Sequence, residues 1–135
     1  MNDISDAHLL THLKISLKNE RQTLAEFLEY LAEADRRRLH EAEAYSSLHK
    51  YCTAVLHLSE GAAYKRITAA RLMRKFPVIL SYVREGKIHL SGLTVIGPLL
   101  TEENHRGLLN EATHKTRKEV ERIRARAEVA RPPVG

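Results

Sequence analysis

The chain has 135 residues, of which 43% are hydrophobic and 29% charged, a balance that fits one soluble globular domain and excludes a disordered chain. Lysine and arginine number 22 against 17 acidic residues, and the net charge of +5 indicates either a polyanionic partner such as nucleic acid or ordinary surface charge. Glycine and proline total only ten, which favours helices.

Several features bear on location. Cys52 is the single cysteine, so an internal disulfide is excluded and a reducing compartment is favoured. No stretch approaches the roughly 20 apolar residues of a membrane span. The opening residues lack the basic and apolar regions of a signal peptide. We therefore expect a cytoplasmic protein with no membrane partner.

The opening segment predicts one long helix, from about Ser5 to Leu39, because neither proline nor glycine interrupts it. Its length would be roughly 50 Å. Leucines recur in it every seven residues, a spacing that suits either a coiled coil between two chains or packing onto the rest of the domain. Glu20 interrupts the companion positions and weakens the coiled-coil alternative. We call the apolar members of the repeat the leucine seam: Leu10, Leu13, Leu17, Leu24, Phe27, Leu31 and Ala34.

Further helices follow, separated by recognisable caps and breaks. A polar turn is expected at 41–46, His57 lies where the chain must turn, and Gly86 suits a left-handed helix end. Ser46 or Ser47 can cap the helix after the polar turn, Ser91 can cap a later short helix, and Thr116 with Glu119 forms a capping box. The expected segments after the first helix are 47–56, 60–76, 77–85, 91–96, 101–113 and 117–128. Together they predict an all-α domain over residues 1–130, with 131–135 as a tail or the start of a linker.

The segment 47–75 has the pattern of a helix-turn-helix unit. Ser59 caps a second helix that carries five cations and one acid, and such a helix can lie in the major groove of DNA. At about 100° per residue, Gly61 and four polar side chains form one strip of this helix. Hydroxyl, guanidinium and ammonium groups are suited to contact bases and phosphates. The predicted DNA-binding residues are Ser59, Gly61, Tyr64, Lys65, Thr68, Arg71 and Lys75. An ordinary solvated helix surface is the alternative.

Enzymatic and metal sites are not indicated. His8 and His12 are the only histidines at helical i,i+4 spacing, and no catalytic glutamate lies between them. Paired cysteines and glycine-rich phosphate loops are absent from the sequence, and Cys52 in an apolar stripe suits a buried thiol. We expect no catalytic residue, no metal and no cofactor.

Much of the chain resembles the helical domain that precedes the HNH endonuclease module in many bacterial proteins. The resemblance rests on 46–53, 58–67, Ala69-Ala-Arg71 with Phe76-Pro77, and 100–105. It implies a role in DNA metabolism. The nuclease residues of that family, histidines and an asparagine around one divalent cation, have no counterpart here, so the resemblance implies DNA targeting or assembly and not catalysis.

Two functions therefore remain open. The first is DNA binding by the predicted residues, with supporting phosphate contacts from Arg36-Arg37-Arg38 and from the helix spanning Arg117 to Arg126. The second is a homodimerisation or protein-interaction module held by the leucine seam. Both can hold together, because helix-turn-helix proteins often bind DNA as dimers.

Overall fold

The computed structural model describes residues 1–130, and the predicted tail at 131–135 lies outside the described residues. The described part is all-α, as the sequence predicted, with eight α-helices, one 3₁₀ turn and no strand within it. The helices are α1 (Asp6–Arg36), α2 (Leu39–Ala42), α3 (Leu48–Ala54), α4 (Glu60–Lys75), α5 (Ile79–Arg84), α6 (Leu90–Ile96), α7 (His105–Ala112) and α8 (Arg117–Ala130), with η1 (Gly97–Leu99) after α6.

Side-chain hydrogen bonds cap the N-termini of most of the longer helices. The hydroxyl oxygens of Ser5, Ser47 and Ser59 each accept a hydrogen bond from the backbone N–H three residues later, at 3.2, 3.0 and 3.1 Å. Thr116 and Glu119 form the predicted capping box, each side chain accepting from the other residue's N–H. These caps satisfy backbone donors that have no partner inside the helix, which explains why the helix starts could be placed from sequence.

Two positive φ angles also match the sequence analysis. His57 has φ +57° in the turn before α4, and Gly86 has φ +70° just after α5. An added Cβ at Gly86 would meet only the guanidinium end of the flexible Arg21 side chain, so the backbone angle is what favours glycine there.

Several predicted boundaries were wrong. The first helix ends at Arg36, and the polar turn expected at 41–46 is partly occupied by α2, which follows a left-handed Arg38 with φ +54°. The cap of α6 is His89, whose Nδ1 accepts from the Gly92 N–H at 3.0 Å, and not Ser91. Thr101 begins a turn that precedes α7. Histidine is an uncommon N-cap residue. The ring of His89 is oriented for this role by a second hydrogen bond, in which its Nε2–H donates to the Lys115 carbonyl oxygen, 3.0 Å away.

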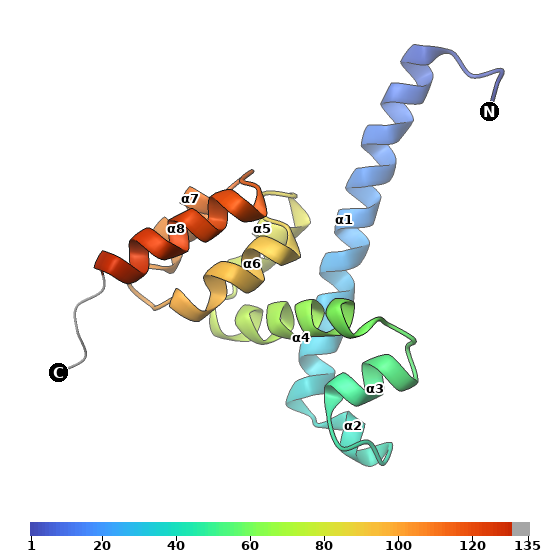
Figure 1. Ribbon diagram of the computed structural model, residues 1–135. Coiled ribbons are helices and arrows are strands. Elements are labelled where there is room, and N and C mark those ends of the chain that lie inside the picture. The colour runs from blue at the N-terminus through green and yellow to red at the C-terminus, as the bar shows by residue number, and fades with distance from the viewer. Residues whose placement is uncertain (131–135) are drawn as a thin grey trace.

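The central helix is α4, which crosses the C-terminal part of α1 (Figure 1). Two apolar clusters lie along it. The larger joins α1 and α4 to α5–α8 and includes the fully buried Leu28, Ile79 and Leu93. The smaller joins α1 and α4 to α3 through side chains such as Cys52 and Ile67. Because α1 and α4 contribute to both clusters, the helices from residue 21 onward share a continuous interior.

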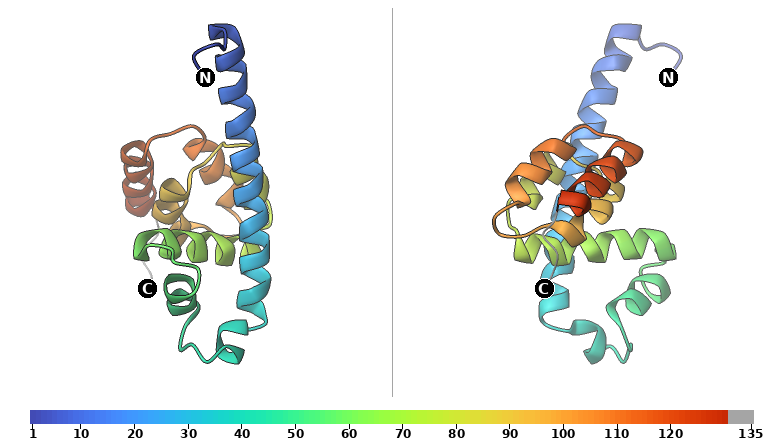
Figure 2. Two further views of the ribbon diagram at one scale, coloured as in Figure 1. Left: turned by 90° about the vertical axis from the view of Figure 1, so that its right-hand side faces the viewer. Right: turned by 60° about the vertical axis from the view of Figure 1, so that its left-hand side comes forward.

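The two ends of α1 have different surroundings. All of residues 1–20 are exposed, and this end projects beyond the other helices in both turned views (Figure 2). We call α1 residues 6–20 the free half and residues 21–36 the packed half. The leucine seam is divided between them: Leu10, Leu13 and Leu17 are exposed, whereas Leu24 is half-buried and Leu31 is buried.

Candidate nucleic-acid interface

Five of the seven predicted DNA-binding residues lie on the solvent side of α4. Gly61, Arg71 and Lys75 are exposed, Tyr64 is 58% exposed and Thr68 is half-buried. The buried side of the same helix consists of Ala63, Ile67, Ala69, Ala70 and Met73. The helical period therefore separates the polar strip from the core, as predicted. We call Gly61, Tyr64, Thr68, Arg71 and Lys75 the α4 strip.

Ser59 and Lys65 have other surroundings. The Ser59 hydroxyl oxygen accepts from the Ala62 N–H, so its first role is to cap α4. Lys65 is half-buried and lies roughly 100° around the helix from Tyr64. Neither residue therefore belongs to the α4 strip. Gly61 does, and an added Cβ there would meet no atom within 4 Å, so the surface is open at the start of the strip.

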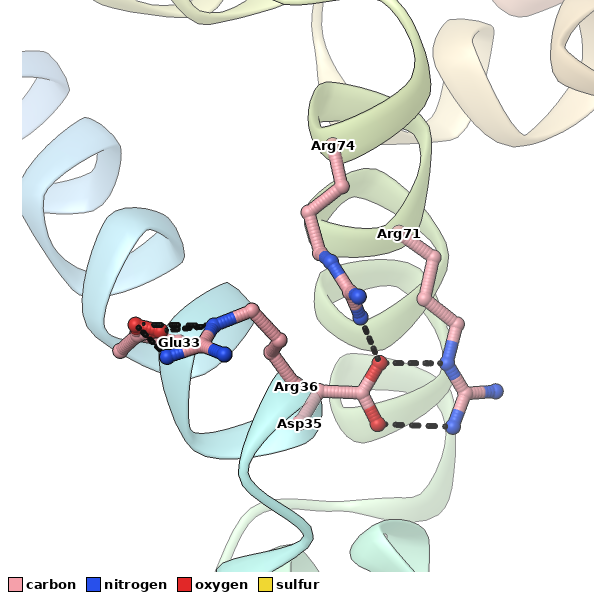
Figure 3. Close-up of polar contacts among 5 residues, drawn as sticks. All are labelled: Glu33, Asp35, Arg36, Arg71 and Arg74. Atoms are coloured by element: carbon pink, nitrogen blue, oxygen red, sulfur yellow. Dashed lines mark hydrogen bonds and ion pairs between the residues drawn. The ribbon is translucent and has the colours of Figure 1, made fainter.

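Arg71 is held by a carboxylate from the packed half of α1. Its Nε and Nη2 donate to the two oxygens of Asp35 at 3.0 and 3.1 Å, a bidentate arrangement, and Arg74 Nη1 lies 3.4 Å from Asp35 Oδ2 (Figure 3). The Asp35 side chain is only 10% exposed, whereas that of Arg71 is 59% exposed. Since a guanidinium has five N–H donors, the pairing fixes the orientation of Arg71 and leaves donors directed to solvent.

The same contact changes the titration of both groups. The hydrogen bond from Arg71 lowers the pKa of the Asp35 carboxyl below its ordinary value of 3.8, against the opposing effect of burial. The hydrogen bond from Asp35 raises the pKa of Arg71. Both groups are therefore charged at neutral pH, and one carboxylate neutralises part of the charge of two arginines.

Three more arginines surround the end of α1. Arg36 is paired with Glu33 (Figure 3), Arg37 Nε lies 3.7 Å from the same carboxylate, and Arg38 is paired with Glu41. We call Arg36, Arg37, Arg38, Arg71 and Arg74 the arginine cluster. Its five guanidinium groups face three carboxylates, those of Glu33, Asp35 and Glu41, so the cluster keeps a net positive charge after internal pairing.

A groove runs beside the α4 strip. Thr68, Arg71 and Lys75 line one side, and Gly97, Pro98 and Leu100 the other, around a volume of about 370 Å³. The Lys75 ammonium also lies 5.8 Å from the centre of the Phe76 ring. The groove has two cations and no acid among its lining residues, which suits an anionic group such as a phosphate.

The arginines of α8 are largely engaged within the protein. Arg117 and Arg124 each pair with the glutamate four residues later, at 3.1 and 2.9 Å, and Arg126 pairs with Glu111. Arg124 also donates to the Val95 carbonyl oxygen at 3.2 Å. This helix is therefore a weaker source of phosphate contacts than its arginine count suggests.

Sequence reasoning missed the role of Asp35. It precedes three arginines in the chain, and its partner is separated from it by 36 residues, so no local pattern could pair the two. The helical wheel of α4 placed Arg71 correctly on the solvent side but could not show that a carboxylate from α1 reaches it.

The thiol and the paired histidines are the other reactive groups that the sequence singled out. The Cys52 thiol is buried, and this burial raises its pKa. The His8 and His12 rings stack with centres 4.4 Å apart. Within residues 1–130 no three histidine, cysteine or acidic side chains gather as metal ligands would. None of the helices in that part of the chain has the length and apolar character needed to cross a bilayer.

Comparison with known proteins adds no assignment: no family model, curated protein or solved structure matches the chain.

Proposed function

We propose that the protein is a DNA-binding helical module that contacts duplex DNA through the α4 strip and the adjoining arginine cluster. The single observation that carries the proposal is the continuity of these groups. Tyr64, Arg71 and Lys75 share the solvent side of one helix, and Asp35, which directly precedes Arg36 to Arg38 in the chain, pairs with Arg71 and Arg74 of that helix.

The geometry suits a helix presented to the major groove. α4 has 16 residues, and none of its exposed residues is aliphatic. α3 precedes it across the turn at 55–59, which is the element order that a helix-turn-helix requires. Tyr64 and Thr68 supply hydroxyl groups that can donate to base edges or phosphates. Arg71, oriented by Asp35, and Lys75 supply charge.

The resemblance to the helical region that precedes HNH nuclease modules supports the same role. In that setting, this module would position chemistry that is performed by another domain. The proposal for these 135 residues is therefore DNA targeting and not catalysis.

The test is the salt dependence of binding to a random-sequence duplex, followed by fluorescence anisotropy. Binding through several phosphates predicts that log K falls linearly with log salt concentration, with a slope near −0.9 per phosphate contact. Lys75→Glu should weaken binding about tenfold or more and reduce the slope by about 1, because it removes a phosphate contact and adds repulsion.

The matched control is Lys115→Glu, which makes the same change of charge on an exposed residue between α7 and α8, outside the α4 strip and the arginine cluster. It should have a clearly smaller effect on affinity. Equal losses in the two variants would mean that only net charge matters, and would contradict the assignment of this surface. Absence of binding by the unaltered protein at low salt would reject DNA binding altogether.

Arg71 needs a different substitution, since Arg71→Ala also removes the bidentate partner of Asp35. Arg71→Lys keeps the charge and loses the two-pronged geometry. If Arg71 contacts a base, this change should lower affinity for a preferred site more than for random duplex. If it contacts only phosphate, both affinities should fall alike.

A second candidate function is protein association, which one observation favours: the leucines of the free half are exposed although they continue the seam of the packed half. This surface is separate from the α4 strip, so it does not compete with DNA binding.

A further inference from the structure

The free half of α1 leaves an apolar stripe uncovered. Leu9, Leu10, Leu13 and Leu17 are between 41% and 59% exposed, and they fall within roughly 100° of one side of the helix. Single exposed leucines are common, but four on one stripe of a projecting helix are typical of an interaction surface.

The stripe has the spacing of a helix that pairs with another helix. Leu10, Leu13 and Leu17 occupy successive positions at intervals of three and four residues, the repeat of coiled-coil contacts. The packed half is anchored by buried residues such as Leu28, so the free half continues a helix that is already nucleated. Binding of a partner would therefore not have to offset the unfavourable free energy of helix nucleation.

The charges beside the stripe favour one kind of partner. Asp3 and Asp6 lie at its start, and Lys14, Lys18 and Arg21 lie at or just beyond its end together with one acid, Glu20. No ion pair within residues 1–130 involves any of these six side chains. Two copies placed antiparallel bring the acidic start of each beside the net positive end of the other. Two parallel copies bring acids beside acids and lysines beside lysines, which is unfavourable.

We propose that the free half of α1 is a dimerisation helix that pairs antiparallel with the free half of a second copy of this chain. The contact consists of Leu9, Leu10, Leu13 and Leu17, flanked by the acids at 3 and 6 and the lysines at 14 and 18 of the two chains. Leu24 and Leu31 take no part, because they pack inside their own chain. This inference does not rest on DNA binding.

The first experiment is sedimentation velocity of the full chain without DNA, over a concentration series reaching about 100 µM, at which an association with Kd ~10 µM gives mostly dimer. We expect a concentration-dependent dimer. A protein that remains monomeric throughout overturns the proposal, whatever else binds the stripe.

Leu10→Glu combined with Leu13→Glu should abolish the dimer, raising its Kd at least a hundredfold, because it places charge in the centre of the contact. The matched control is Ile15→Glu, which changes an apolar residue of similar exposure (47%) roughly 150° around the same helix. Ile15→Glu should leave the Kd within about threefold. If Ile15→Glu dissociates the dimer as well as the double leucine variant does, the stripe is not the contact.

Charge reversal tests the antiparallel arrangement. Lys14→Glu with Lys18→Glu should weaken the dimer about tenfold, and so should Asp3→Lys with Asp6→Lys, since each places like charges side by side. All four changes together should restore the affinity. The restoration is decisive, because Asp6→Lys alone also removes an acid from the first turn of α1. In a parallel pair each double change only replaces one pair of like charges with another, so neither variant would weaken the dimer, and that result would reject the proposed orientation.

Discussion

The two halves of α1 have similar sequences and different surroundings. Both carry leucines at seven-residue spacing, but Leu10 and Leu17 are exposed whereas Leu24 and Leu31 face the interior. The difference arises from what lies opposite: α4 and α5 pack against the packed half, and within residues 1–130 no element covers residues 6–20. A regular apolar repeat therefore predicts that a helix has an interaction surface, but it does not predict where the partner is.

In the packed half, the most deeply buried residues lie outside the seven-residue repeat. Its most buried members are Ala25 and Leu28, both 0% exposed, and neither belongs to the leucine seam. Leu31 of the seam, 5% exposed, and Ala32, 8% exposed, come next. Small alanines allow α4 to approach α1 closely. The stripe that packs is thus displaced around the helix from the seam, toward the i, i+3, i+7 series of 25, 28 and 32.

The largest expected difference between the halves is in core packing. Leu28→Ala should lower the free energy of unfolding by about 2–5 kcal/mol, because Leu28 is fully buried in the larger cluster. Leu13→Ala should change it by less than about 0.5 kcal/mol in the monomer, because Leu13 is 59% exposed. Urea unfolding at low protein concentration measures both. Similar losses would mean that the free half is covered in solution by another part of the same chain.

A smaller effect is expected where the packed half meets α4 through Asp35. Asp35→Asn should cost about 1 kcal/mol at pH 7, since Arg71 loses its charged partner but remains accessible to water. The folded-state pKa of Asp35 lies below 3.8, so this contribution is present above pH 3.8 and is lost as the pH falls through the lowered pKa. Unfolding curves of the protein and the variant should therefore differ at neutral pH and converge as the pH falls below 3.8 through the lowered pKa. A difference that stays constant into strong acid would contradict the assignment.

Helix caps provide a matched pair of substitutions. Ser59→Ala should lower the free energy of unfolding by about 1 kcal/mol, because Ser59 caps the central helix α4. Ser5→Ala removes the equivalent hydrogen bond at the free half, where the first turn can fray without disturbing the core. Its effect should be confined to faster amide hydrogen exchange near the start of α1. A loss of global stability equal to that of Ser59→Ala would show that the two halves unfold together.

Removal of residues 1–17 alters more of the chain than any substitution, but we expect it to change stability least. Removing residues 1–17 should alter the free energy of unfolding by no more than about 0.5 kcal/mol, since every residue removed is exposed. Urea unfolding measures the free energy change. Circular dichroism of the folded protein should lose only the helix signal of the segment removed. Collapse of the remaining fold would contradict the division of α1 proposed here.

Local sequence was sufficient for much of the fold. Ser5, Ser47 and Ser59 begin helices where they were predicted to, because a cap is a contact within three residues of the chain. Gly86 ends α5 for a similarly local reason. The same locality explains why the α4 strip was found, since the helical period alone places Tyr64, Thr68 and Lys75 on one side.

Contacts between distant segments were not predictable in this way. The pairing of Asp35 with Arg71 and the capping of α6 by His89, whose ring is held by the Lys115 carbonyl, join residues far apart in the chain. α2 was missed because its four residues carry no periodic pattern. Which members of the leucine seam are buried depends on the position of α4 and α5 against α1.

The sequence by itself thus determined every helix except α2, the starts of α1, α3, α4 and α8, and the polar side of α4, because these depend on interactions within one or two helical turns. Only the tertiary structure decided which half of α1 is covered and which carboxylate holds Arg71. Burial and ion pairing depend on what another segment brings into contact, and residue spacing along one helix carries no information about that segment.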